Sequence, residues 1–213
     1  MLCLVLPALA ESWTPLPDGA FDLALPLPEP VTVAIHAREH EAAVVAIRAM
    51  DRRALSGGQV ADHAFLHAWE LVRAGRASEA AALVPTFEQA PTPPPAYIDL
   101  VAGEALAADG KHVEAAARLE KVLVAGSPIS ARARLALASA YVGAEREADA
   151  RRVYEAIAAA ADPSPGVEKA LSWLWQRLGK ASKEAIPHAR RIYRYYPGTA
   201  EDRAIADWFV PTA

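Results

Sequence analysis

The sequence predicts an all-α fold, a right-handed α-solenoid of about four antiparallel helix pairs. From Val31 onward, apolar residues recur at positions i, i+3 and i+4, which is the pattern of an amphipathic helix. Glycines and prolines interrupt these helical segments at regular intervals. Equivalent residues return every 35 positions. One helix pair of that size cannot bury its own apolar face, so successive pairs are expected to stack.

The repeat is clearest in the second helix of each pair. One alanine marks each unit: Ala80, Ala115, Ala150 and Ala185. Twelve positions earlier, the first three units have a small residue: Ala68, Gly103 and Ala138. Five positions earlier, where the two helices of a pair are joined, the residues are Gly75, Gly110, Glu145 and Lys180. We expect the small residues to lie where the helices cross, because small side chains allow the backbones to approach closely.

Composition divides the chain into four parts. Residues 1–10 read MLCLVLPALA, an apolar run that ends in small residues as a secretory signal peptide does. A short apolar element of the mature fold is the alternative. Residues 11–30 contain five prolines and are predicted to be an extended linker. Residues 31–198 carry the helical repeats, and residues 199–213 form a C-terminal helix or tail.

The repeat units resemble those of tetratricopeptide repeat proteins. The segments that carry the resemblance are AWELVRAGRASEAAALV, GEALAADGKHVEAAARLEKVL, ASAYVGAEREADARRVYEAI and, more weakly, LWQRLGKASKEAIPHARRIYRYYP. An earlier stretch, HEAAVVAIRAMD, resembles a second helix alone. The aromatic residue expected early in each first helix is replaced by Ala64, Asp99, Arg134 and Lys169, so the units are degenerate. The resemblance covers about residues 38–198 and implies a scaffold that binds a protein or peptide.

A narrower resemblance concerns the end of the chain. The stretch RRIYRYYPGTAEDRAIADWF is similar to the last unit in the N-terminal superhelical region of soluble lytic murein transglycosylases. That family implies a periplasmic protein that acts at peptidoglycan. Its catalytic Glu-Ser motif with a following Gly-Leu-Met-Gln stretch is absent, since Glu11-Ser12 has no such sequel. The resemblance therefore implies the non-catalytic arm of such an enzyme, with the catalytic domain elsewhere in the native protein.

Repeat position also predicts a binding groove. In tetratricopeptide-like arrays the first helices line the concave face. The predicted binding residues are Asp62, Trp69, Tyr97, Glu104, Arg132 and Arg177. Trp69 and Glu104 share one row of the groove, and Asp62, Tyr97 and Arg132 share another. Mixed charge with exposed aromatic rings suits a peptide or a glycan strand. The alternative is that the tryptophans fill the core between units.

Two histidine pairs raise the question of a metal site. His36 and His40, and likewise His63 and His67, are spaced i, i+4 and so share a helix face. Four imidazoles could converge if the two helices were antiparallel neighbours. Neither pair forms an H-E-x-x-H arrangement, and Cys3 is the only cysteine. We predict no cofactor and no metal, with these histidines as the alternative ligand set.

Composition and motifs argue against several other functions. The net charge of −4 and the pI near 5.9 disfavour a general nucleic-acid binder. There is no Gly-Lys-Ser/Thr phosphate loop and no Gly-x-Ser-x-Gly elbow. No stretch has the roughly 20 apolar residues of a membrane span. The sequence predicts a non-catalytic, periplasmic binding scaffold of the bacterial cell envelope; the superhelical domain of a lytic transglycosylase is the alternative.

Overall fold

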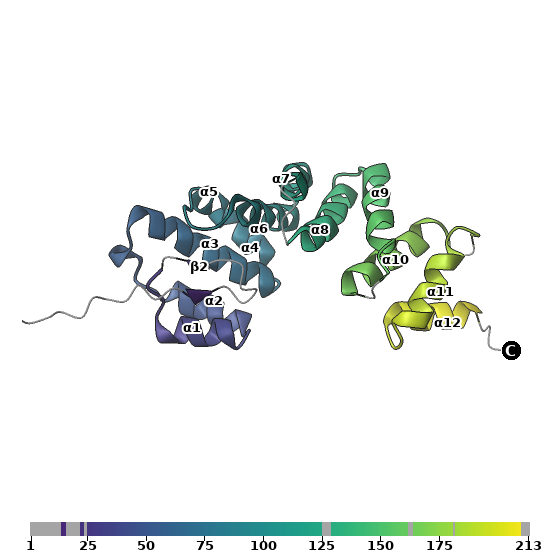
Figure 1. The fold of residues 1–213 in the computed structure, drawn as a ribbon, viewed down its shortest axis with the longest axis horizontal. Helices are drawn as coiled ribbons and strands as arrows, with labels where there is room; N and C mark the ends of the chain where they lie inside the picture. Colours follow the sequence, from purple (N-terminus) through teal and green to yellow (C-terminus); the bar gives the residue numbers. More distant parts are fainter. Residues whose placement is uncertain are drawn as a thin grey trace, which may run out of the picture. The chain divides into compact units, whose positions relative to one another are not determined.

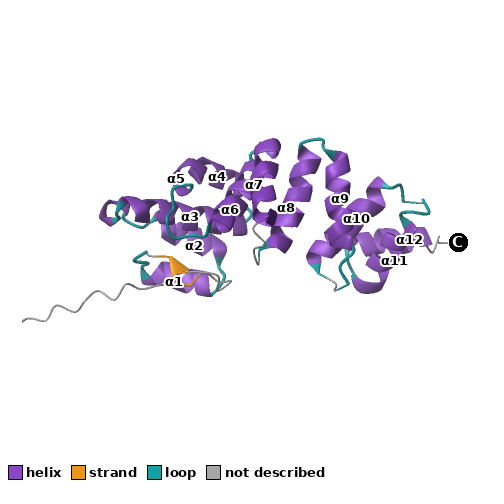
Figure 2. Cartoon of the chain, turned by 45° about the horizontal axis from the view of Figure 1, so that its top comes forward, coloured by secondary structure: helices purple, strands orange, loops and turns teal. Residues whose placement is uncertain are grey.

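The computed structural model describes residues 14–15, 22–23, 25–124, 129–161, 164–180 and 182–209. The predicted signal segment, residues 1–10, lies outside the described residues. The regular secondary structure of the described part is helical except for one short antiparallel pairing, between β1 (Thr14–Pro15) and β2 (Asp22–Leu23) (Figures 1 and 2). The chain forms two compact units, unit 1 (Met1–Arg118) and unit 2 (Leu119–Ala213).

Unit 1 contains a series of helices that pack against their neighbours in sequence. They are α1 (Glu29–His36), α2 (His40–Arg48), the 3-10 helix η1 (Arg52–Ala54), α3 (Gly57–Arg73), α4 (Ala77–Ala80), the 3-10 helix η2 (Ala81–Leu83), α5 (Val84–Phe87) and α6 (Pro95–Ala108). α1 packs on α2, α2 on α3, and α3 on α4, α5 and α6. The contact between α3 and α6, the first helices of successive pairs, is the stacking that the repeat predicts.

Unit 2 repeats this arrangement. α7 (His112–Val124) begins in unit 1 and ends in unit 2, and it is followed by α8 (Ser130–Gly143), α9 (Glu147–Ala158), α10 (Pro165–Arg177), α11 (Ile186–Tyr195) and α12 (Ala200–Phe209). Each helix from α8 to α12 packs on the next, and the first helices α8 and α10 also touch. Within each unit, the predicted all-α architecture of stacked helix pairs is confirmed.

The described part of the proline-rich segment differs in two respects from the predicted linker. Its backbone is extended, as expected, but Leu23 and Leu25 are only 1% and 2% exposed. α1 also begins at Glu29, within the predicted linker, because proline fits the first turn of a helix, where its missing N–H is not needed. The half-unit read from HEAAVVAIRAMD is therefore the second member, α2, of a short but complete helix pair.

The second helix of the next pair is broken rather than continuous. Its residues divide into α4, η2 and α5. Pro85 lies in the first turn of α5, where it cannot donate the backbone hydrogen bond that a continuous helix would require. The 35-residue period located this helix, but not the interruption.

The repeated small residues are buried where neighbouring helices cross. Ala80, Ala115, Ala150 and Ala185 are all 0% exposed, as are Ala68 and Ala138. A larger side chain at any of these positions would have to displace a neighbouring helix. The fourth unit departs from the pattern, because Ala185 precedes α11 rather than lying inside it.

The turns between paired helices explain the repeated glycines. Gly75, Gly110 and Gly179 have positive φ angles of 77°, 81° and 82°. Glycine adopts this left-handed conformation without steric cost. Glu145 occupies the equivalent turn between α8 and α9 with φ of 59°, so a glutamate takes the conformation that glycine takes elsewhere.

Replacing Glu145 with glycine is expected to raise the free energy of unfolding by about 1 kcal/mol, because it removes the cost of a left-handed non-glycine residue. Urea denaturation followed by circular dichroism would measure the change. The converse variant, Gly75→Ala, should lower stability by a similar amount. A Glu145→Gly variant no more stable than the native chain would contradict the strain assigned to this turn.

Candidate binding surface

The structure places Trp69 in the core of unit 1. Its side chain is 1% exposed, and its ring centroid lies 6.0 Å from that of Phe65 and 5.9 Å from that of Tyr97. Phe65 meets Phe87 edge to face at 6.0 Å, and Tyr97 is 5% exposed. The prediction that Trp69 and Tyr97 are exposed in a groove is therefore wrong. These rings fill the space between helices, as the alternative held.

Asp62 is also buried rather than open to a ligand. It is 1% exposed, and its carboxylate accepts hydrogen bonds from the Thr92 backbone N–H at 3.2 Å and from the Thr92 hydroxyl at 2.5 Å. A buried carboxylate must be hydrogen-bonded to offset its desolvation. Asp62 therefore fastens α3 to the loop before α6, which corrects its predicted place on the groove.

The other three predicted residues lie nearer the surface. Glu104 on α6 and Arg132 on α8 are half-buried, and Arg177 at the end of α10 is exposed. Glu104 belongs to unit 1, whereas Arg132 and Arg177 belong to unit 2. Of the predicted binding residues, these three are the ones that a partner could reach.

Unit 2 has a small pocket around one of these residues. The pocket has a volume of about 130 Å³ and is lined by Val142, Glu145, Glu147, Trp173 and Arg177. The Arg177 guanidinium carbon lies 5.9 Å from the centroid of the Trp173 ring, and its Nε lies 3.8 Å from a Glu147 carboxylate oxygen. The Trp173 ring and two glutamate carboxylates thus line the pocket together with the positively charged side chain of Arg177.

The Trp173 ring packs against a buried tyrosine. It stacks on Tyr154 of α9, with a centroid separation of 4.6 Å and an interplanar angle of 27°. Tyr154 is 2% exposed, whereas Trp173 is half-buried. A fixed aromatic ring with part of its surface exposed is a frequent anchor in protein interfaces.

Trp173, Glu145 and Glu147 are not among the binding residues predicted from the sequence. One signal was present. At the repeat position where Ala68 and Ala138 are small, the fourth unit has Trp173. A large aromatic residue at a position that is small in other units marks local divergence from the repeat.

The histidines do not converge. His40 Nδ1 lies 2.8 Å from a carboxylate oxygen of the buried Glu70, whereas His63 Nε2 lies 3.1 Å from the Ile47 carbonyl oxygen at the other end of α2. His36 is exposed. Within the described ranges, no group of three or more His, Cys, Asp or Glu side chains could hold a metal ion. The histidines predicted as the alternative metal ligands are therefore not brought together at one site.

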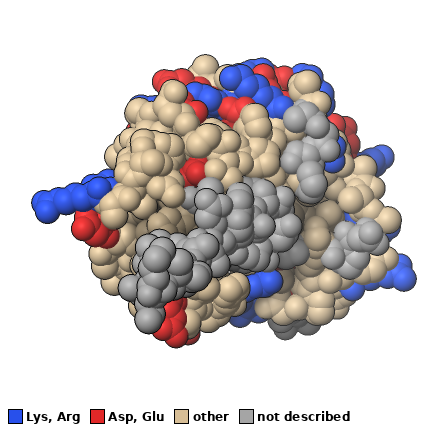
Figure 3. Space-filling view, turned by 60° about the vertical axis from the view of Figure 1, so that its left-hand side comes forward, with Lys and Arg blue, Asp and Glu red and all other residues tan. Residues whose placement is uncertain are grey.

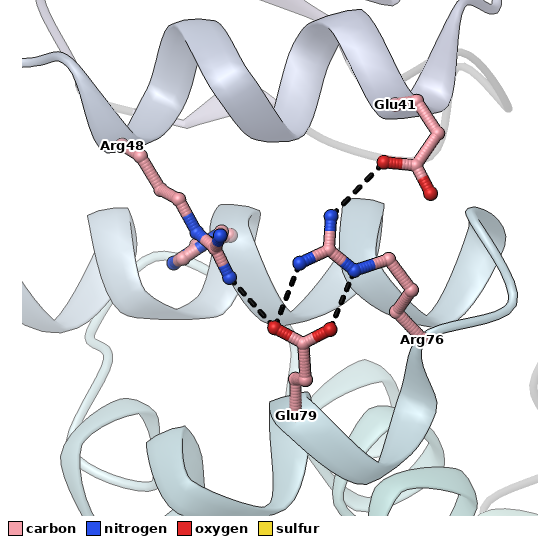
Figure 4. A network of polar contacts seen from close by, with 5 residues as sticks. Glu41, Arg48, Arg76 and Glu79 are labelled. Carbon is pink, nitrogen blue, oxygen red and sulfur yellow. Dashed lines mark hydrogen bonds and ion pairs between the residues drawn. The ribbon is translucent and has the colours of Figure 1, made fainter.

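A network of charged side chains links α2 to the start of α4 (Figure 4). Glu79 accepts hydrogen bonds from Arg76 at 2.5 and 2.7 Å and from Arg48 at 2.8 Å, while Arg76 also reaches Glu41 at 3.0 Å. The bonds from Arg76, followed by the bond from Arg48, lower the pKa of Glu79 to about 2. The network ties successive helix pairs together, with two acidic and two basic side chains.

His67 lies beside this network and is expected to make stability depend on pH. Burial, followed by the charge of Arg48, lowers its pKa from 6.5 to about 4, and its Nε2 accepts a hydrogen bond from Arg48 Nε at 3.3 Å. The folded state thus favours neutral His67. This stability is complete above pH 6.5 and is lost as the pH falls from 6.5 toward 4.

Comparing urea unfolding at pH 7 and pH 4.5 tests this dependence. His67→Gln should lose about 1 kcal/mol less than the native chain on acidification, after allowing for solvent screening of a partly exposed group. His36→Gln, which removes an exposed imidazole, is the matched control and should retain the native pH dependence. Equal losses in the native chain and in His67→Gln would show that His67 does not contribute.

Two further surface features bear on binding. A shallow apolar groove between α1 and α2 is lined in part by Val33 and Val45, which are 58% and 65% exposed. Among the described residues visible in Figure 3, basic and acidic side chains are interspersed, mainly along the margins of the face. The charged side chains of described residues visible there form no extended patch of one sign, such as nucleic-acid binding would require.

The comparisons with known proteins agree with this geometry. A family profile described as tetratricopeptide repeat matches residues 106–174, a stretch that includes α7, α8 and α9 and most of α10. The chain therefore has a tetratricopeptide-like helical repeat fold, as the sequence predicted. Repeats of this class imply protein partners. The resemblance to lytic transglycosylases is not shown by these comparisons, and no enzyme family is indicated.

Solved structures of MamA are similar to this chain. A substituted form of MamA shares 20% identity over 78% of this chain and 93% of its own, with a TM-score of 0.55. MamA AMB-1 shares 21% identity over 83% of this chain and 93% of its own, with a TM-score of 0.54. At this identity the similarity concerns the fold alone. No curated protein matches the sequence. No helix in the described part is long and apolar enough to cross a membrane.

Proposed function

We propose that this chain is a non-catalytic scaffold of the bacterial cell envelope that binds a protein partner on its stacked helix pairs. The observation that carries the proposal is the packing of α8, α9 and α10 on one another, within the stretch that the family profile matches. Buried alanines such as Ala115 and Ala150 fix the helices at close crossings, and surface side chains are thereby held in place before binding. Such preorganisation reduces the entropy cost of association.

The test has two steps. The purified full chain is first used to capture proteins from envelope and cytoplasmic fractions of the same cells. Each captured protein is then purified and titrated against the full chain by calorimetry. A saturable complex of defined stoichiometry is expected, and no complex at micromolar concentration with any captured protein would overturn the proposal.

A parallel incubation with purified peptidoglycan tests the alternative function, the non-catalytic domain of a lytic transglycosylase. Retention on peptidoglycan, with no protein partner, would favour a non-catalytic arm of a glycan-cleaving enzyme. Trp173→Ala is the informative variant, because Trp173 is half-buried at the surface whereas Trp69 lies in the core. A protein scaffold is expected to show no such retention.

The proposal also includes export to the periplasm, which rests on the apolar run MLCLVLPALA at residues 1–10. Cell fractionation followed by mass spectrometry of the N-terminus would test it. We expect chain lacking this run in the periplasmic fraction. Chain that retains Met1 and is confined to the cytoplasm would remove this part of the proposal.

A further inference from the structure

The unit 2 pocket has more carboxylates than cations. Glu145 and Glu147 both line it, and Arg177 is the one basic residue among its lining residues. The nearby Arg146 is engaged with Asp149 at 2.8 Å and lies over the Tyr141 ring at 4.3 Å. The pocket therefore has a net charge of about −1 from its lining side chains.

Arg177 is loosely held. The 3.8 Å separation between its Nε and the Glu147 carboxylate is longer than a hydrogen bond, and its side chain is 54% exposed. Its guanidinium carbon nevertheless lies over the Trp173 ring at 5.9 Å, within the range of a cation–π contact. Arg177 thus shows which chemistry the pocket accommodates, without filling it tightly.

The carboxylate of Glu145 forms no ion pair with any residue in the described ranges, although it lines the same pocket as Arg177. A second guanidinium entering the pocket could pair with Glu145 and lie against the Trp173 ring. Arginine suits such a site because its planar group can both stack on an aromatic ring and donate two hydrogen bonds to one carboxylate.

We propose that the pocket formed by Glu145, Glu147 and Trp173 binds an arginine side chain of a basic partner peptide, in competition with Arg177. This inference rests on the proposed protein-binding function and names the chemistry of the partner. The volume of about 130 Å³ admits the end of one side chain rather than a secondary-structure element. Binding is therefore expected to be weak for a single residue and to add to contacts elsewhere on the partner.

The test uses the full chain and a capped five-residue peptide, Gly-Ser-Arg-Ser-Gly. Its control is the same peptide with citrulline, which has nearly the same shape as arginine but no charge. The readout is the NMR signal of the Trp173 indole N–H, assigned with Trp173→Phe. We expect a saturable shift at millimolar arginine peptide, weakened by added salt, and no saturable shift with the citrulline peptide.

Three variants separate a binding role from a structural one. Glu145→Gln with Glu147→Gln should weaken binding about tenfold, whereas Arg177→Gln should strengthen it about threefold because the internal competitor is gone. Glu184→Gln removes one negative charge at an exposed site outside the pocket and should leave the affinity unchanged. Dispersed NMR spectra would confirm that each variant is folded.

The outcomes are decisive in both directions. Equal shifts with arginine and citrulline peptides, or no shift with either, would overturn the arginine site. So would an Arg177→Gln variant that binds no more tightly than the native chain. If the arginine site fails while a captured protein still forms a complex, the proposed function stands alone. If the peptide binds but no protein partner is found, the proposed function fails instead.

Discussion

Replacing Trp69 with alanine is expected to lower the free energy of unfolding by about 3–5 kcal/mol, the range found when a buried tryptophan is truncated. The indole is 1% exposed, contacts Phe65 and Tyr97, and has the Arg73 guanidinium carbon 5.5 Å from its ring centroid. Its removal leaves a cavity where α3 meets α6. Urea denaturation followed by circular dichroism would measure the loss.

Trp173→Ala provides the matched comparison, because it removes the same side chain from a half-buried site. It should cost about 1–2 kcal/mol, since less apolar surface is removed from contact. If Trp69→Ala cost less than Trp173→Ala and weakened partner binding instead, Trp69 would be a groove residue, as its repeat position had indicated.

Replacing Ala150 with leucine is expected to destabilise the chain by about 1–3 kcal/mol, the usual cost of inserting extra methylene groups into a packed interior. Ala150 is 0% exposed on α9, which packs against both α8 and α10. A larger side chain would have to separate these helices. The melting temperature and the urea midpoint should fall together.

Ala156→Leu on the same helix is the control, because Ala156 is exposed. Leucine and alanine are both good helix formers, so this change should alter stability by less than about 0.5 kcal/mol. Equal effects at both positions would mean that Ala150 does not lie at a tight helix crossing, and that the 35-residue period has another origin.

The sequence predicted the fold well because the repeat has direct physical causes. Gly75 and Gly110 return where a tight turn requires positive φ, and Ala115 and Ala150 return where helices cross. These constraints act locally and so leave a periodic pattern. The break at Pro85 was not predicted, because the period averages over units and conceals a feature of one of them.

The binding residues were harder to predict, for a geometric reason. Repeat position assigns a residue to a face of a first helix, but it does not say whether that face is covered. α3 packs against α2, α4, α5 and α6, so Asp62 and Trp69 are buried although their register matches a groove. Arg177 lies at the end of α10 and stays exposed. The sequence contains little information about which helices are covered by neighbouring helices on most of their faces.

Protein binding by stacked helix pairs is tested most directly by calorimetric titration of the full chain with a purified protein captured from the same cells. A saturable complex of defined stoichiometry, weakened by Trp173→Ala but not by Glu184→Gln, is the expected result. The contradicting result is that no captured protein gives saturable heat at micromolar concentration while the chain is folded. In that case the tetratricopeptide-like fold would serve some purpose other than binding a protein.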